Sequence, residues 1–230
     1  MIALVSKNLS EQSQSQLKKY VDEIFIIDNY EFISDSVGLH PDIHFSYIDG
    51  ILFYNPVFEK LVEKIKLKYS ILAQSGSFIS KSPYPFDAGY NVLVNEKWAF
   101  HNFKYTDPIL LKYLKKTKRK IITVNQGYAN CSSILLDNLL VSSDRGMIKT
   151  ATSAGLDSLY IDNSQIKLKD YKNGFIGGCV GQWQDKIFVN GNVKLYNWGN
   201  TFINKCLNLG KNCVFLQENY LEDVGSIFFI

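Results

Sequence analysis

The same short pattern recurs along this chain: an apolar stretch, a tight polar turn and a second apolar stretch. The turns are centred on Asp49 in IDGILFY, Asn95 in VNEKWAF, Asp137 in LDNLLVS and Asp185 in QDKIFVN. Apolar runs on both sides of a polar turn predict a pair of antiparallel strands. The turns are about 40 to 50 residues apart, a period that is typical of propellers and other repeat architectures. This repeat limits the possible folds more than any other feature of the sequence.

A helix is expected after two of these hairpins because its first residues can be recognised. Asn55 precedes Pro56 in NPVFEKLVEKIK, and Asp107 precedes Pro108 in DPILLKYLKK. Asn and Asp side chains cap helix N-termini, and proline fits the first helical position because its missing N–H would have no partner there. Each helix then leads into a further apolar stretch, YSILAQ or KIITVNQ. The repeating unit is therefore predicted to be β-β-α-β.

Four units are complete, and the two ends of the chain are predicted to supply the fifth. The C-terminal YLEDVGSIFFI has the pattern of a first strand, while MIALVSKN, LSEQSQSQLKKYVDE and IFIID supply a strand, a helix and a strand. We expect one α/β domain over residues 1–230, a five-fold pseudosymmetric α/β propeller closed by pairing of the N- and C-terminal strands. Such pairing would remove exposed sheet edges that promote aggregation.

Composition excludes several classes of protein. The chain of 230 residues is 46% hydrophobic and 20% charged, which is typical of an ordered globular protein. Its net charge of +3 is too small to indicate a nucleic-acid partner. The four cysteines form no paired CxxC spacing, so we expect free thiols, a cytoplasmic location and no metal or other cofactor. No apolar stretch approaches the roughly 20 residues of a membrane span, so no membrane partner is expected.

Chemically versatile residues stand where the first strand of each unit begins. In a propeller these strands approach one axis, so residues distant in sequence can meet at one site. The positions carry His40 and Asp42, Phe86 and Asp87, Tyr128, Asn130 and Cys131, Gly177, Gly178 and Cys179, and Glu222 and Asp223.

A thiol, an imidazole and carboxylates are the groups that nucleophilic catalysis requires. The thiolate attacks, the histidine transfers protons, and carboxylates orient the histidine or bind a cationic substrate. Each residue also has a structural explanation. A lone cysteine in an apolar strand usually belongs to the core, a histidine beside proline usually bonds within a turn, and an aspartate early in a strand often accepts backbone amides. Their coincidence at corresponding points of different repeats favours a site.

The stretch GLHPDIHFSYID resembles the His-x-Asp strand of the guanidino-group-modifying enzymes, through His40, Asp42 and Phe45. This pentein superfamily includes arginine deiminases, agmatine deiminases and dimethylarginine dimethylaminohydrolases, and its members are five-fold rings of β-β-α-β units. NQGYANCSSILLDN is similar to the strand that carries the family's nucleophile, with Cys131 at the cysteine position. LEDVGSIFF is similar to a Glu-Gly-Gly-Asp-Val type strand through Glu222 and Asp223.

The resemblance implies an amidino- or guanidino-group hydrolase or transferase for a small cationic compound. Cys131 would be the nucleophile and His40 the acid and base, while Asp42, Glu222, Asp223 and Cys179 would line the substrate site. The circular order of the units agrees with the family. The linear order differs, which implies a circular permutation.

One residue both departs from the family pattern and competes with this assignment. Cys179 occupies a position where the family often has a further acidic residue, and GGCV around it is similar to the family's nucleophile loop.

Two other functions stay open. One is a ring that binds a small ligand or a protein without turnover, and the other is an unrelated cysteine hydrolase that performs acyl transfer.

Overall fold

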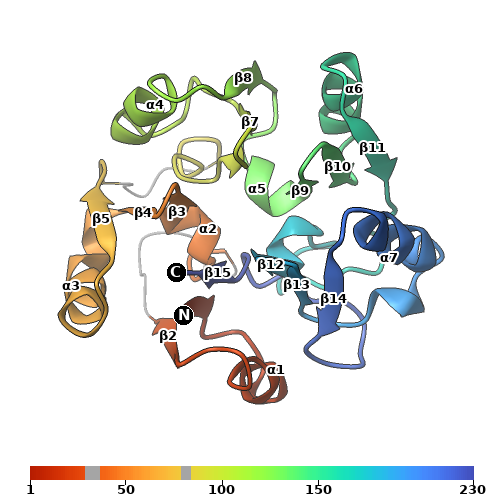
Figure 1. Cartoon of the computed structure of the whole chain (residues 1–230), viewed down its shortest axis with the longest axis horizontal. Helices are drawn as coiled ribbons and strands as arrows, with labels where there is room; N and C mark the ends of the chain where they lie inside the picture. The colour runs from red at the N-terminus through yellow and green to blue at the C-terminus, as the bar shows by residue number, and fades with distance from the viewer. Residues whose placement is uncertain (29–36, 79–83) are drawn as a thin grey trace.

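The computed structural model describes residues 1–28, 37–78 and 84–230, and within them fifteen strands form five three-stranded sheets. In Figure 1 the sheets lie around a common centre. The five sheets are β15 (Phe228–Phe229), β1 (Ile2–Ser6) and β2 (Glu23–Ile27); β3 (Phe45–Ile48), β4 (Ile51–Tyr54) and β5 (Leu72–Ser75); β6 (Leu93–Val94), β7 (Trp98–His101) and β8 (Lys120–Thr123); β9 (Ser133–Leu136), β10 (Leu139–Ser142) and β11 (Asp157–Tyr160); β12 (Val180–Trp183), β13 (Lys186–Val189) and β14 (Asn212–Phe215).

Every sheet has the same topology. Its middle strand pairs antiparallel with one neighbour and parallel with the other. The predicted hairpins around Asp49, Asn95, Asp137 and Asp185 are present and join the two antiparallel strands of four sheets. Asp49 and Asp137 have positive φ angles of 53° and 46°, a conformation that Asp tolerates better than most residues. The β-β-α-β prediction is confirmed.

The helices that follow the hairpins lie on the outside of the molecule, and two short helices lie near its centre (Figure 1). The predicted caps are present, because the side chains of Asn55 and Asp107 accept backbone N–H groups of the following turn. The outer helices are α1 (Glu11–Leu17), α3 (Glu59–Lys68), α4 (Pro108–Leu114), α6 (Arg145–Ser153) and α7 (Gly199–Asn208), and the central ones are α2 (Pro41–His44) and α5 (Ala129–Ser132). The described ranges also contain three 3₁₀ helices, η1 (Pro56–Phe58), η2 (Gly177–Cys179) and η3 (Val193–Leu195).

The first and last strands pair as the sequence predicted. Backbone N–H and carbonyl groups of Ile2 and Ile230 are joined in both directions, at 2.9 and 3.0 Å. β15 thereby completes the sheet of β1 and β2 and takes the place that the first hairpin strand has in the other four sheets. None of the described sheets is itself closed.

The segment after His40 begins with a helical turn, whereas the sequence predicted a strand from this point. α2 covers Pro41–His44, and β3 starts only at Phe45. Pro41 explains the difference, since its fixed φ angle suits the first helical position. The same arrangement recurs in α5 before β9 and in η2 before β12. The inner end of each of these three units is therefore a short helical turn that presents side chains to the centre.

Large apolar side chains fill the space between neighbouring sheets. One cluster packs α7 and the β12–β14 sheet against the β9–β11 sheet through residues such as Phe202, Ile187 and Val141. None of the helices in the described part of the chain has the length and apolarity needed to cross a lipid bilayer.

Candidate active site

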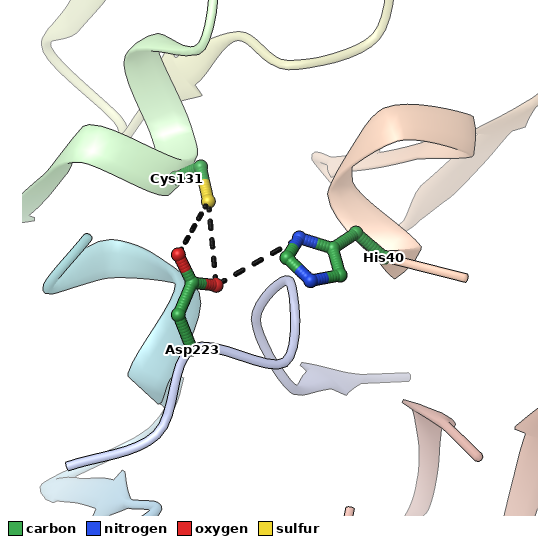
Figure 2. A group of neighbouring side chains, drawn as sticks. All are labelled: His40, Cys131 and Asp223. Carbon is green, nitrogen blue, oxygen red and sulfur yellow. Dashed lines mark hydrogen bonds and ion pairs between the residues drawn. The ribbon is translucent and has the colours of Figure 1, made fainter. Parts of the chain in front are cut away.

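His40, Cys131 and Asp223 converge near the centre of the molecule from three different units (Figure 2). His40 is the N-cap residue of α2, Cys131 lies in α5, and Asp223 lies in the loop before β15. One ligand-type atom from each side chain lies within 4.8 Å of the other two. The three residues that the sequence placed at equivalent positions of different repeats are therefore neighbours.

Asp223 is the central member of this group. The thiol of Cys131 lies 3.6 Å from Oδ1 and 3.5 Å from Oδ2 of Asp223 and donates to this carboxylate. Nδ1 of His40 lies 3.7 Å from Oδ1 of Asp223, too far for a hydrogen bond. The backbone N–H groups of Phe175 and Gly225 donate to the same carboxylate at 2.8 and 3.1 Å and fix its orientation.

Two glycines make this close approach possible. A Cβ atom on Gly178 would lie 1.8 Å from Oδ1 of Asp223 and 2.9 Å from Sγ of Cys131. A Cβ atom on Gly225 would lie 2.1 Å from Cβ of His40, and this glycine also has a φ angle of +79°. The glycine pair before Cys179 therefore provides room for Asp223 and Cys131, which explains GGCV without a nucleophile at Cys179.

Asp42 lies in a second layer. Its Oδ2 atom accepts a hydrogen bond from Oγ of Ser226 at 2.8 Å, and Oγ of Ser226 accepts one from the side chain of Asn130 at 3.0 Å. The Asp42 side chain is fully buried, and its Oδ1 atom has no hydrogen-bond partner among the described residues. An unpartnered carboxylate oxygen in the interior is costly when it is charged.

Burial favours the neutral form of every titratable group in the site. It raises the pKa of Asp42 to about 6, and burial together with the neighbouring Asp42 raises the pKa of Asp223 to about 7. Burial lowers the pKa of His40 to about 3. Burial, and then the carboxylates of Asp223 and Asp42, raise the pKa of the Cys131 thiol well above its usual value. A cation beside these groups would instead favour the ionised forms of Asp42, Asp223 and Cys131, because it stabilises both carboxylates and the thiolate.

The three residues lie at the wall of a cavity of about 410 Å³. This volume lies in the range of small-molecule sites. The remaining lining is largely aromatic and aliphatic. Among the described residues it consists of Val37, Ile43, Tyr84, Gln126, Tyr128, Leu168, Tyr171, Asn173 and Phe175.

The other predicted site residues do not reach this cavity. Cys179 is fully buried in a hydrophobic cluster, and its thiol donates to the carbonyl oxygen of Phe175 at 3.2 Å. Glu222 is half-buried and does not line the cavity, in keeping with the alternation of side chains along an extended segment. Asp42 is not among the described lining residues either, and its contact with Ser226 lies in the interior.

Two residues that support the site were not predicted. The side-chain oxygen of Asn91 accepts the backbone N–H of Cys131 at 3.0 Å, and Ser226 bonds to Asp42. Both residues occupy the inner end of a unit, like the residues that were predicted. Position in the repeat could therefore have identified them, although neither side chain is typical of a catalytic group.

The same three atoms could also hold a metal ion. His, Cys and Asp are ligands of Zn²⁺, and three protein ligands with an open fourth position are typical of catalytic zinc sites. Among the described residues this is the one cluster of at least three such side chains. An ion bound here would occupy the thiol, so a metal site and a free nucleophile exclude each other.

The comparisons with known proteins agree with this architecture. A family model described as "Family of unknown function (DUF6873)" matches residues 4–228. No curated protein matches the sequence.

Among solved structures, the chain is similar to dimethylarginine dimethylaminohydrolase (DDAH) from Pseudomonas aeruginosa, a cysteine-to-serine mutant complexed with citrulline. The TM-score is 0.58 at 8% identity, with 97% of this chain and 92% of that chain covered. The N-terminal domain of ArgZ, a cyanobacterial arginine dihydrolase, gives 0.54 at 11% identity over 96% of this chain and 91% of that one. C. jejuni agmatine deiminase gives 0.55 at 10% identity over 94% and 87%. Structural similarity at identities this low shows a shared fold and nothing more.

Proposed function

The chain belongs to a family of unknown function (DUF6873) and has the pentein fold, and we propose that it is a cysteine-dependent hydrolase or transferase of small cationic amidino or guanidino compounds. The observation that carries this proposal is the contact between the thiol of Cys131 and the carboxylate of Asp223 beside His40, at the wall of a cavity. The similar structures include proteins described as an arginine dihydrolase and an agmatine deiminase.

The charges of the site favour a cationic substrate. Asp223 and Asp42 are both buried and both have raised pKa values, so each is stabilised by a positive charge that enters the cavity. An amidinium or guanidinium ion is planar and carries several N–H donors, which suits a carboxylate acceptor. Its charge would also lower the pKa of the Cys131 thiol, whose resting state is neutral.

The proposed reaction begins with Cys131. Its proton passes to Asp223, which already accepts its hydrogen bond, so the negative charge moves from the carboxylate to the sulfur. Sγ attacks the amidine carbon, and a C–S bond forms. The C–N bond to the leaving group then breaks. The departing amine takes the proton that Asp223 received from the thiol, relayed through the neutral imidazole of His40, which faces Asp223 and is neutral again afterwards.

The covalent intermediate is resolved by a second nucleophile. In hydrolysis, water attacks the same carbon after His40 accepts one of its protons, the C–S bond breaks, and the thiol is restored with a proton. In transfer, an amine takes the place of the water. The products are an amine and a carbonyl compound in the first case, and an amine and a new amidino compound in the second. No oxidant or reductant is required.

The test is release of ammonia or amine from a panel of guanidines and amidines, measured with wild type and Cys131→Ala. The matched control is Cys206→Ala, since Cys206 is also buried but belongs to the core cluster around α7. Turnover by wild type and by Cys206→Ala, but not by Cys131→Ala, is expected. Equal activity of Cys131→Ala, or turnover that EDTA abolishes, would refute the proposal in favour of another nucleophile or a metal.

A further inference from the structure

The cavity changes in character from its floor to its rim. His40, Cys131 and Asp223 are at most 4% exposed, whereas Tyr84 and Tyr171 are 48% and 51% exposed. A ligand that places a cationic group beside Asp223 must therefore extend the rest of its structure past these two tyrosines.

The hydroxyl groups of two wall tyrosines are already bonded to the protein. The hydroxyl of Tyr128 donates to Oδ2 of Asp87 at 2.5 Å, and the hydroxyl of Tyr84 accepts the N–H of Gly127 at 3.1 Å. Their ring centroids are 4.9 Å apart with an interplanar angle of 54°. These bonds hold the two rings in place, so both offer ring surface to a ligand, and the O–H of Tyr128 is no longer free to donate.

The remaining wall is mostly apolar. Val37 and Ile43 are 8% and 1% exposed, and Leu168 and Phe175 are half-buried. Contacts between such side chains and a ligand make the free energy of binding more favourable, in proportion to the apolar surface removed from water. The side-chain amide of Gln126 is not free to bind a ligand in full, because it accepts the N–H of Tyr128 and donates to Asp144.

Charged partners for the far end of a ligand are missing from the described part of this wall. Among the described lining residues none is Lys or Arg, and Asp223 is the one carboxylate. Lys167 and Lys172 line a neighbouring hollow of about 390 Å³, which shares Leu168 and Tyr171 with the cavity. At the described part of the wall, a carboxylate or ammonium group on the tail would lose hydration without gaining an ion pair.

We propose that the substrate carries a single cationic amidino or guanidino group on an uncharged aromatic or apolar tail that packs between Tyr84, Tyr128 and Tyr171. This inference rests on the proposed function for the head group and adds the class of the tail. It distinguishes the chain from an enzyme for free amino acids or diamines, which carry a second charge at the far end.

The experiment compares benzylguanidine, arginine, agmatine and methylguanidine as substrates of wild type. We expect kcat/KM for benzylguanidine to exceed that for arginine and agmatine by about tenfold or more, a ratio that one well-filled apolar pocket can supply. Comparable or higher values for arginine or agmatine would overturn the inference while leaving the proposed function in place.

Binding is measured separately by calorimetry on Cys131→Ala, which cannot form the covalent intermediate. Tighter binding of benzylguanidine than of arginine and agmatine supports the inference even if no compound is turned over by wild type, an outcome that would refute only the proposed function. If none of the compounds binds, both fail.

A variant of the rim tests the contact itself. Tyr171→Ala should lower kcat/KM for benzylguanidine about five- to tenfold, through KM, and leave methylguanidine within about twofold. Tyr171→Phe should keep the wild-type preference because it retains the ring. The control is Tyr160→Ala, an exposed tyrosine that packs on Arg145 outside the cavity. An equal loss for both substrates, or the same loss in the control, would contradict the assignment.

Discussion

Sγ of Cys131 lies 3.5 Å from Oδ2 of Asp223, a residue 92 positions away in the sequence. Cys131 lies in the short helix α5, and Asp223 lies in the loop before β15. Gly178 in η2 makes room for the contact, because a Cβ atom at this position would clash with both side chains. Because the thiol donates to a buried carboxylate, the resting site holds a neutral sulfur and a proton acceptor for it. The proposed chemistry depends on a substrate cation to separate these charges.

His40→Ala should reduce activity by about 100-fold or more, because the departing amine loses its proton donor. Folding should change little, since Nε2 of His40 has no hydrogen-bond partner among the described residues and Nδ1 makes only a 3.7 Å approach to Asp223. Turnover and urea unfolding of the same preparation test both parts.

The control for this variant is His101→Ala. His101 is fully buried, and its ring nitrogens lie 2.6 Å from Oγ1 of Thr106 and 2.7 Å from the carbonyl oxygen of Gly127. Its removal should destabilise the fold by about 1–3 kcal/mol because these partners lose their bonds. A larger loss of stability in His40→Ala than in His101→Ala would make His40 a structural residue.

Asp42→Asn should stabilise the protein at alkaline pH. The pKa of Asp42 is about 6 in the folded protein and near 3.8 without the fold, so the folded state binds the proton more tightly. Stability is therefore lost as the pH rises from about 4 through 6, when the buried carboxyl ionises. The asparagine keeps an acceptor for Ser226 and carries no charge.

The expected gain of Asp42→Asn over wild type is about 1–3 kcal/mol at pH 8 and close to zero at pH 4. Urea unfolding at both pH values measures it. Comparing the two proteins at each pH cancels the opposite effect of the histidines, whose lowered pKa values make both proteins less stable in acid. A gain in stability that is the same at pH 4 and pH 8 would show that ionisation of Asp42 does not destabilise the folded protein.

Benzamidine should bind more tightly as the pH rises through 7. Its amidinium stays charged, and the carboxyl of Asp223, with a pKa of about 7, ionises in this range. Calorimetry between pH 5.5 and 8.5 should show affinity rising about tenfold per pH unit below the pKa and levelling off above it. Asp223→Asn should remove this pH dependence, and an affinity that is flat with pH in wild type would contradict a carboxylate–cation contact.

Gly178→Ala should abolish activity because the added methyl group displaces Asp223 and crowds Cys131. The control is Gly146→Ala, at an exposed position in the first turn of α6 where the nearest atom is a carboxylate oxygen of the N-cap residue Asp144, 3.0 Å from the added carbon and far less close than the contacts at Gly178. This variant should retain activity. Wild-type turnover by Gly178→Ala would show that the close packing of Asp223 against Cys131 is not needed.

The repeat made most of the fold predictable. Polar turns such as Asp49 and helix caps such as Asp107 act locally, so their structural effect can be inferred from a few neighbouring residues. The helical turn at Pro41–His44 was missed because an alternating apolar pattern over so few residues fits a strand as well as one helical turn.

The site was predictable only in part. His40, Cys131 and Asp223 occupy equivalent ends of different units, so repeat position was enough to bring them together. Which side chain faces the cavity depends on packing that no local pattern encodes. Cys179 and Glu222 occupy the same kind of position but lie outside the cavity lining. Whether the chain is a circular permutation of the family arrangement stays a prediction.

The most direct measurement compares alkylation of the four cysteines by 2-chloroacetamidine and by 2-chloroacetamide, an uncharged compound of the same size, with mass-spectrometric mapping at pH 6 to 9 in EDTA. We expect the amidine to label Cys131 at least about tenfold faster than the amide does, and Cys179, Cys206 and Cys213 to show no such preference. Equal labelling of Cys131 by both reagents, or no labelling of Cys131 at all, would contradict an amidine-recognising thiol at this site.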